Sequence, residues 1–112
     1  MSDVYIDKAK TNINAITKYG TFVIKEVGDN AEIIHLEGTR TDFRLGYSSV
    51  FFGSLEVDVT NESDLSYGSD ITMSSSRSPD KDHFLFKGFI NETGSAKVII
   101  KNKNGFVQLK GV

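Results

Sequence analysis

Residues 96–111 read AKVIIKNKNGFVQLKG, with Asn104-Gly105 near the middle of the run. Asn-Gly is the preferred pair for a two-residue type I′ turn, because both central positions of that turn need a positive φ. The residues on either side alternate largely between apolar and polar types, as half-buried strands do. A two-residue loop at this point would place Ile100 opposite Leu109. We therefore predict a C-terminal β-hairpin over residues 96–111.

The outward face of this hairpin would carry most of its lysines. An interaction surface often combines charged groups with exposed aliphatic and aromatic ones, and Ile99 and Phe106 share the predicted outward face. We predict a partner-binding surface that consists of Lys97, Lys101, Lys103, Phe106 and Lys110. The alternative is that these lysines only solvate a strand edge and keep it from pairing with other chains.

The sequence upstream of residue 96 is a succession of β-like runs and turns. Thr21–Val27, Ala31–Glu37, Ser48–Thr60 and His83–Ile90 are rich in β-branched or aromatic residues, and turn-forming residues separate them. Seven or eight strands at intervals of about ten residues are typical of an all-β domain. We predict one domain over residues 1–112, either an antiparallel β-sandwich or a small closed barrel.

The N-terminal segment supports two interpretations. Ile6, Ala9, Ile13 and Ile16 follow the spacing of one helix face, which predicts a possible helix over residues 4–18. Val4 and Ile6 also alternate as they would in a strand. If the helix forms, the alternative architecture is an α+β fold with a helix on a curved antiparallel sheet.

Composition excludes several classes of protein. The chain has 112 residues, 13 Lys+Arg, 15 Asp+Glu and no cysteine, so disulfides, thiolate zinc sites and a cysteine nucleophile are excluded. No apolar run approaches the roughly 18 residues that a membrane-spanning helix needs. The first residues show no secretory signal, so we expect a cytoplasmic protein without a membrane association.

Charge is distributed unevenly along the chain. Residues 26–70 contain ten acidic and two basic side chains, whereas residues 81–112 contain six lysines and two acidic side chains. Complementary segments of this kind favour a protein partner or self-association. Nucleic acid is not expected as a partner, because the acidic segment would repel phosphates.

Catalytic and metal-binding signals are weak. The two histidines, His35 and His83, show no surrounding pattern of a catalytic triad, and the Gly46-Tyr47-Ser48-Ser49-Val50 stretch lacks the second glycine of a nucleophile elbow. No phosphate-binding glycine motif occurs, and the acidic turn residues fail the EF-hand pattern. We predict a protein that is not an enzyme and uses no cofactor, although turn carboxylates leave calcium binding open.

These observations favour a non-catalytic recognition module of the immunity, inhibitor or assembly type, which binds a protein partner through the basic hairpin face. The alternative is a lectin-like, carbohydrate-binding β-sandwich, with calcium as a possible aid. In that alternative, Tyr47 and Tyr67 would stack on sugar rings, while Asp58 and Asp64 would supply polar contacts. The absence of tryptophan removes the largest stacking side chain from this second interpretation.

Overall fold

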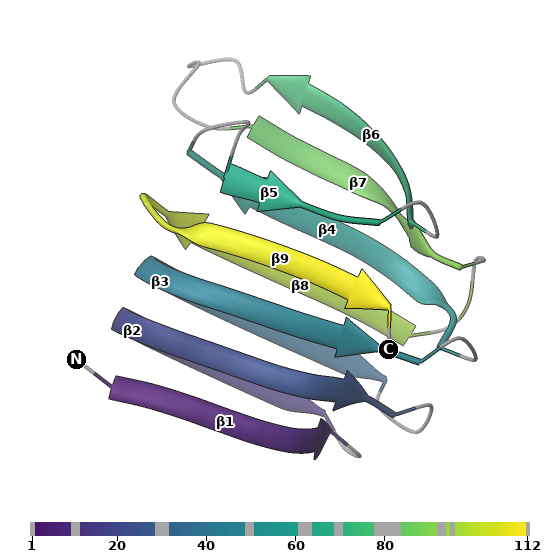
Figure 1. The fold of residues 1–112 in the computed structure, drawn as a ribbon. Coiled ribbons are helices and arrows are strands. Elements are labelled where there is room, and N and C mark those ends of the chain that lie inside the picture. The colour runs from purple at the N-terminus through teal and green to yellow at the C-terminus, as the bar shows by residue number, and fades with distance from the viewer. Residues whose placement is uncertain are drawn as a thin grey trace.

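The computed structural model describes residues 2–9, 12–28, 32–48, 51–60, 64–68, 71–77, 84–91, 94 and 96–111. Within these ranges the protein consists largely of strands and contains no helix (Figure 1). The strands are β1 (Ser2–Ala9), β2 (Ile13–Val27), β3 (Ile33–Tyr47), β4 (Gly53–Val59), β5 (Leu65–Ser66), β6 (Ile71–Arg77), β7 (Phe84–Ile90), β8 (Ala96–Lys103) and β9 (Phe106–Gly111). The prediction of a mainly β protein is confirmed.

The strands form one mixed sheet. Its main path runs β1-β2-β3-β8-β4-β7-β6, while β9 pairs with β3 and β5. The two ends of this path, β1 and β6, do not pair with each other in the described part of the chain, so the sheet is not closed. Among the described strands, antiparallel pairing is confined to β7 with its neighbours β4 and β6, and the other pairings are parallel. The prediction of an antiparallel arrangement is therefore wrong for most of the sheet.

The sheet folds over on itself because its long strands bend (Figure 1). The first halves of β2 and β3 lie in a back layer with β8, β4, β7 and β6. Their second halves lie in a front layer with β1, β9 and β5. We call one passage through both layers a coil. Parallel strands need a crossover connection, and here the half-strand in the other layer supplies it.

The bends of three coils, those of β2, of β3 and of β8 with β9, lie at residues with a positive φ. These residues are Tyr19 (φ 54°), Arg40 (φ 50°) and Asn104 (φ 58°). They occupy equivalent positions in neighbouring coils, since the strand registers on either side of them match. The left-handed conformation changes the direction of an extended chain. The three bends thus stack into a column along one side of the molecule, which we call the corner.

The corner also shifts the alternation of side chains by one residue. Before Arg40, Ile34 and Leu36 point inward; after it, Phe43 and Leu45 do, and all four are at most 2% exposed. Both halves of each coil therefore contribute to one core between the two layers. Because both layers share this core, the alternation of inward and outward side chains does not continue unbroken along the whole of β3.

The predicted N-terminal helix over residues 4–18 is wrong, and the α+β alternative is wrong with it. Apart from Asn12, the described residues of that segment belong to β1 and β2. Ile13, Ala15 and Thr17 turn toward the interior, whereas Ile16 is 75% exposed. Ile16 produced the apparent helical spacing, but its side chain lies on the outer face of a strand.

The predicted C-terminal hairpin is also wrong. Within the described residues, β8 and β9 do not pair with each other, and both lie parallel to β3. Between β8 and β9 the chain passes from the back layer to the front layer instead of reversing within one layer (Figure 1). This arrangement is favourable because β8 has a hydrogen-bonded neighbouring strand on each side, β3 and β4. A hairpin would by itself give β8 only one such neighbour, β9.

Candidate functional site

The lysines of the predicted surface lie on two different faces of the molecule. Lys97, Lys101 and Lys103 are exposed on the outer face of the back layer, on β8. Phe106, which is 38% exposed, and Lys110 lie on β9 in the front layer. The five residues therefore do not form one continuous face, because β8 and β9 belong to different layers.

A groove of about 470 Å³ crosses the outer face of the back layer beside the corner. Two of the predicted residues, Lys101 and Lys103, line it, whereas Lys97 does not. The other residues along it are Ile16, Thr17, Lys18, Glu37, Gly38, Thr39, Asp58, Thr60 and Asn102. These residues come from β2, β3 and β8 and from the end of β4, so four coils that are distant in sequence build the groove together.

Charges of both signs alternate across the groove. The strand register places Lys101 between Glu37 on β3 and Asp58 on β4. In the next row, Thr39 separates Lys18 from Lys103. The first row holds two acidic groups around one cation, while the second holds two cations without an acidic neighbour in register. The positive charge of the groove is therefore concentrated in the row of Lys18 and Lys103, which lies nearer the corner.

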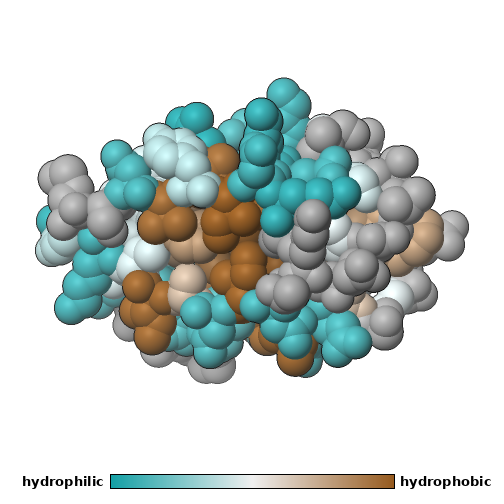
Figure 2. All heavy atoms as spheres, turned by 90° about the horizontal axis from the view of Figure 1, so that it is seen from below, coloured by the Kyte–Doolittle hydropathy of each residue, from teal (hydrophilic) through white to brown (hydrophobic). Residues whose placement is uncertain are grey.

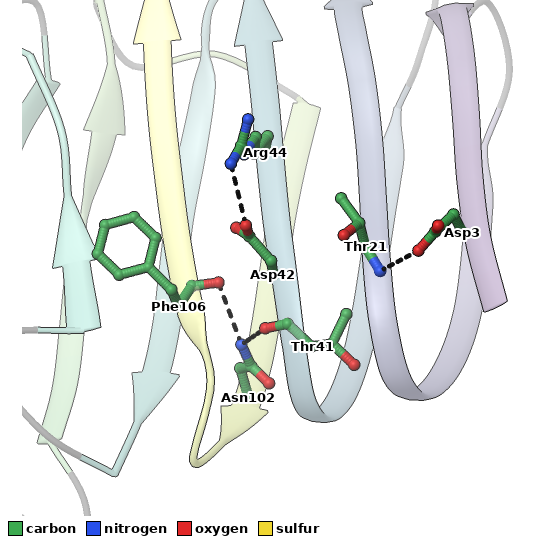
Figure 3. A network of polar contacts seen from close by, with 7 residues as sticks. All are labelled: Asp3, Thr21, Thr41, Asp42, Arg44, Asn102 and Phe106. Atoms are coloured by element: carbon green, nitrogen blue, oxygen red, sulfur yellow. Dashed lines mark hydrogen bonds and ion pairs between the residues drawn. The ribbon is translucent and has the colours of Figure 1, made fainter. Parts of the chain in front are cut away.

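Hydrogen bonds at the corner hold the end of the groove in place. Asn102 is 4% exposed, and its Nδ2 donates to the carbonyl oxygens of Thr41 at 2.6 Å and Phe106 at 3.2 Å (Figure 3). The backbone N–H of Asn104 donates to Thr60 Oγ1 at 2.8 Å, which ties the β8 coil to the β4 coil. These bonds fix the backbone that carries Lys101 and Lys103.

A second hollow, of about 370 Å³, lies on the outer face of the front layer. Lys25, Arg44 and Lys110 line it, and Gly46 leaves space between the two lysines. Arg44 is already paired with Asp42, with 3.2 Å between Nη2 and Oδ2 (Figure 3). Of the predicted residues only Lys110 is found here.

The residues of the glycan alternative are not gathered into one site. Tyr47 is completely buried in the core, so its ring is not accessible to a sugar. Tyr67 is 43% exposed and follows β5, close to Asp64 in sequence. Asp58 lies on β4, in the back layer, and lines the groove beside the corner. The geometry gives this alternative no support.

Among the described residues, the catalytic and metal candidates do not gather into a site. His35 contacts Glu37, with 3.3 Å between Nε2 and Oε1, on the outer face of β3. No group of three His, Asp or Glu side chains that could hold a metal occurs among the described residues. His83 and the turn residues near 29–30 and 80–82 lie outside them. No helix that could span a membrane is present in the described ranges.

Several groove residues were not predicted as part of the partner-binding surface, and Asp58 was named only for the glycan alternative, although the sequence holds a signal for them. Ile16, Glu37 and Asp58 are spaced 21 residues apart, and so are Lys18, Thr39 and Thr60. A fixed period of this length is the signature of stacked coils. It identifies residues at equivalent positions of successive coils: those of β2 and β3 pair directly, whereas β8 lies between those of β3 and β4.

Comparison with known proteins gives no relative of this chain. No family model, no curated protein and no solved structure matches it.

Proposed function

We propose that the protein is a non-catalytic recognition module that binds a protein partner in the groove beside the corner. The observation that carries this proposal is the gathering of Lys18, Lys101 and Lys103 with the exposed Ile16 around one groove of about 470 Å³. The proposal takes the folded sheet to be a two-layered sandwich of stacked coils, which serves as a rigid frame for surface side chains.

The chemistry of the groove suits a polypeptide segment. Lys18 and Lys103 have no acidic neighbour in their row, so they can bind a carboxylate of the partner. Ile16 provides an apolar contact at the β2 end of the groove. Glu37 and Asp58 in the adjacent row would repel the phosphates of nucleic acid. A segment with an acidic and an apolar side chain close together meets these requirements.

A library of random peptides tests the proposal, because such a library samples many partner sequences at once. We expect the immobilised wild-type protein to enrich peptides that combine acidic residues with an apolar residue. The double variant Lys101→Glu/Lys103→Glu should lose this binding, because it reverses two charges at the groove. Lys97→Glu is the matched control, since Lys97 lies on the same face of β8 but outside the groove.

Because Lys101 lies between two acidic residues, its reversal alone can lower stability. Lys103→Glu serves as a second variant, because Thr39, its neighbour in register on β3, is uncharged. Its far-UV spectrum and thermal unfolding should match the wild type while peptide affinity falls. Failure to enrich any peptide, or enriched peptides that bind Lys103→Glu as tightly as wild type, would contradict the proposal.

A further inference from the structure

The stack of coils ends at β1 with a step between the two layers. β1 pairs with residues 20–27 of β2, which form the front-layer half of that strand. The back-layer half, Ile13–Lys18, pairs with β3 on one side only, and no strand among the described residues lies on its other side. The front layer is therefore one strand longer than the back layer at this end.

This end also exposes apolar groups. Figure 2 views the molecule from this end and shows apolar atoms in the middle, framed by hydrophilic ones. Half-buried side chains on the inner faces of β1 and β2 are Val4, Ile6, Ile13 and Ala15. On the outer faces, Tyr5 is 71% and Ile16 75% exposed, the highest values among the large apolar residues described.

An extended strand would suit this edge of the back layer. The edge of Ile13–Lys18 presents backbone N–H and C=O groups that only another extended backbone pairs along its length. The vacant place in the back layer is one strand wide, and it lies across the core from β1. The occupant must therefore present inward apolar side chains that pack against Val4 and Ile6.

We propose that the occupant is β1 of a second copy of this chain. The two copies would be related by a two-fold axis that runs parallel to the strands and lies between the two layers. Rotation about this axis places the front layer of one copy in line with the back layer of the other. The step of each copy then receives the extra strand of its partner, so both steps are filled at once. The interface is closed and isologous, as in most homodimers.

The strand directions set how the two edges meet. The chain reverses direction at the corner, so β1 and the first half of β2 run oppositely across the core (Figure 1). A rotation about an axis along the strands keeps each direction, so β1 of the second copy lies antiparallel to Ile13–Lys18. On β1 the inward side chains are Val4 and Ile6, and in Ile13–Lys18 the odd-numbered side chains face inward. Only registers that keep both sets inward are allowed.

One such register is complementary at every outward position. It places Tyr5 opposite Ile16, Asp3 opposite Lys18, and Asp7 opposite Asn14. The two most exposed apolar side chains then cover each other, and Lys18 gains an acidic partner that its own chain does not provide in register. A shift by two residues in either direction would place an aspartate opposite Ile16. The side chains thus select this pairing.

This dimer would use Ile16 and Lys18, which also line the groove, and would leave Lys101 and Lys103 as the groove residues that reach a partner. Its test reads mass instead of ligand binding, so it can fail while the groove function holds, and the reverse. Light scattering of the eluting wild-type protein should give twice the monomer mass of 12.4 kDa. Asp3→Lys or Lys18→Asp places like charges opposite each other, so each should weaken the dimer by about tenfold or more. The double variant Asp3→Lys/Lys18→Asp should restore it. A wild-type protein that remains monomeric at the highest concentrations reached would overturn the proposal. In that case a strand of another protein would be the candidate to pair with Ile13–Lys18.

Cysteine pairs test the register itself, because the chain contains no cysteine. Oxidation of Tyr5→Cys/Ile16→Cys should give a disulfide-linked dimer, since residues opposite each other in an antiparallel pair lie within bridging distance. Tyr5→Cys/Ile33→Cys is the control, because Ile33 is also exposed but lies on β3, away from the edge. Equal cross-linking of the two variants would overturn the proposed register.

Discussion

The carboxamide of Asn102 joins two coils at the corner. Its Nδ2 donates to carbonyl oxygens of Thr41 on β3 and Phe106 on β9, and its side chain is almost fully buried. A buried carbonyl that loses its donor keeps the full cost of its desolvation. The corner therefore depends on a donor at position 102 more than on the volume of that side chain.

Asn102→Ala should lower the free energy of unfolding by about 2–3 kcal/mol, because it leaves two carbonyls without their donor. Asn102→Asp should lower it further at neutral pH, since a carboxylate has no hydrogen to donate and would face two carbonyl oxygens. Urea denaturation measures both values, with the exposed Asn14→Ala as control. If Asn102→Asp were as stable as Asn102→Ala, the donor role would be disproved.

The neighbouring pair Asn104-Gly105 shows what the sequence predicts at this scale. A positive φ at Asn104 was expected and is found. Gly105, however, has no positive φ; it is needed because a Cβ there would lie 2.6 Å from Asn102 Nδ2 and also collide with the Thr41 carbonyl oxygen. Local turn preference predicted the positive φ at Asn104 but not the passage between layers, and the Thr41 carbonyl that packs against Gly105 comes from a coil more than 60 positions away.

At the scale of elements, most strands were predictable and their neighbours were not. Alternation in Leu55, Val57 and Val59 predicted β4, and these side chains are buried. The 21-residue spacing of Ile13, Ile34 and Leu55 gives the pairing of Ile13 with Ile34, but Ile34 and Leu55 both pair with Val98 of the last coil, which does not follow this spacing. That coil follows the others in sequence, yet β8 lies between β3 and β4 in space. A local sequence pattern does not indicate that β8 is inserted between β3 and β4.

The insertion of β8 predicts how the protein tolerates truncation. Removal of residues 96–112 should abolish folding, because β3 and β4 would each lose a parallel neighbour and the core would lose Val98, Ile100 and Leu109. Removal of residues 1–9 should preserve the fold, since β1 lies at the end of the sheet and pairs with β2 alone. Far-UV circular dichroism and urea unfolding distinguish these outcomes. A folded 1–95 fragment would contradict the central position of β8.

At the scale of the whole molecule, the uneven charge along the chain becomes an even distribution in space. The acid-rich segment 26–70 supplies β3 and β4, and the lysine-rich β8 lies between them. Lys101 stands between Glu37 and Asp58, and Lys87 on β7 stands opposite Glu56. The asymmetry that suggested an external partner is thus largely compensated within the fold.

This arrangement predicts that salt destabilises the protein. Attraction between neighbouring strands of opposite charge is screened as ionic strength rises, so the free energy of unfolding should fall by about 1 kcal/mol between about 0.02 M and 0.5 M NaCl. Urea denaturation at the two salt concentrations measures the difference. Lys101→Met keeps much of the apolar stem but removes the charge between Glu37 and Asp58, so its salt dependence should be smaller than that of the wild type. A free energy of unfolding that rises with salt would mean that repulsion dominates, contrary to the charge pattern of β3, β8 and β4.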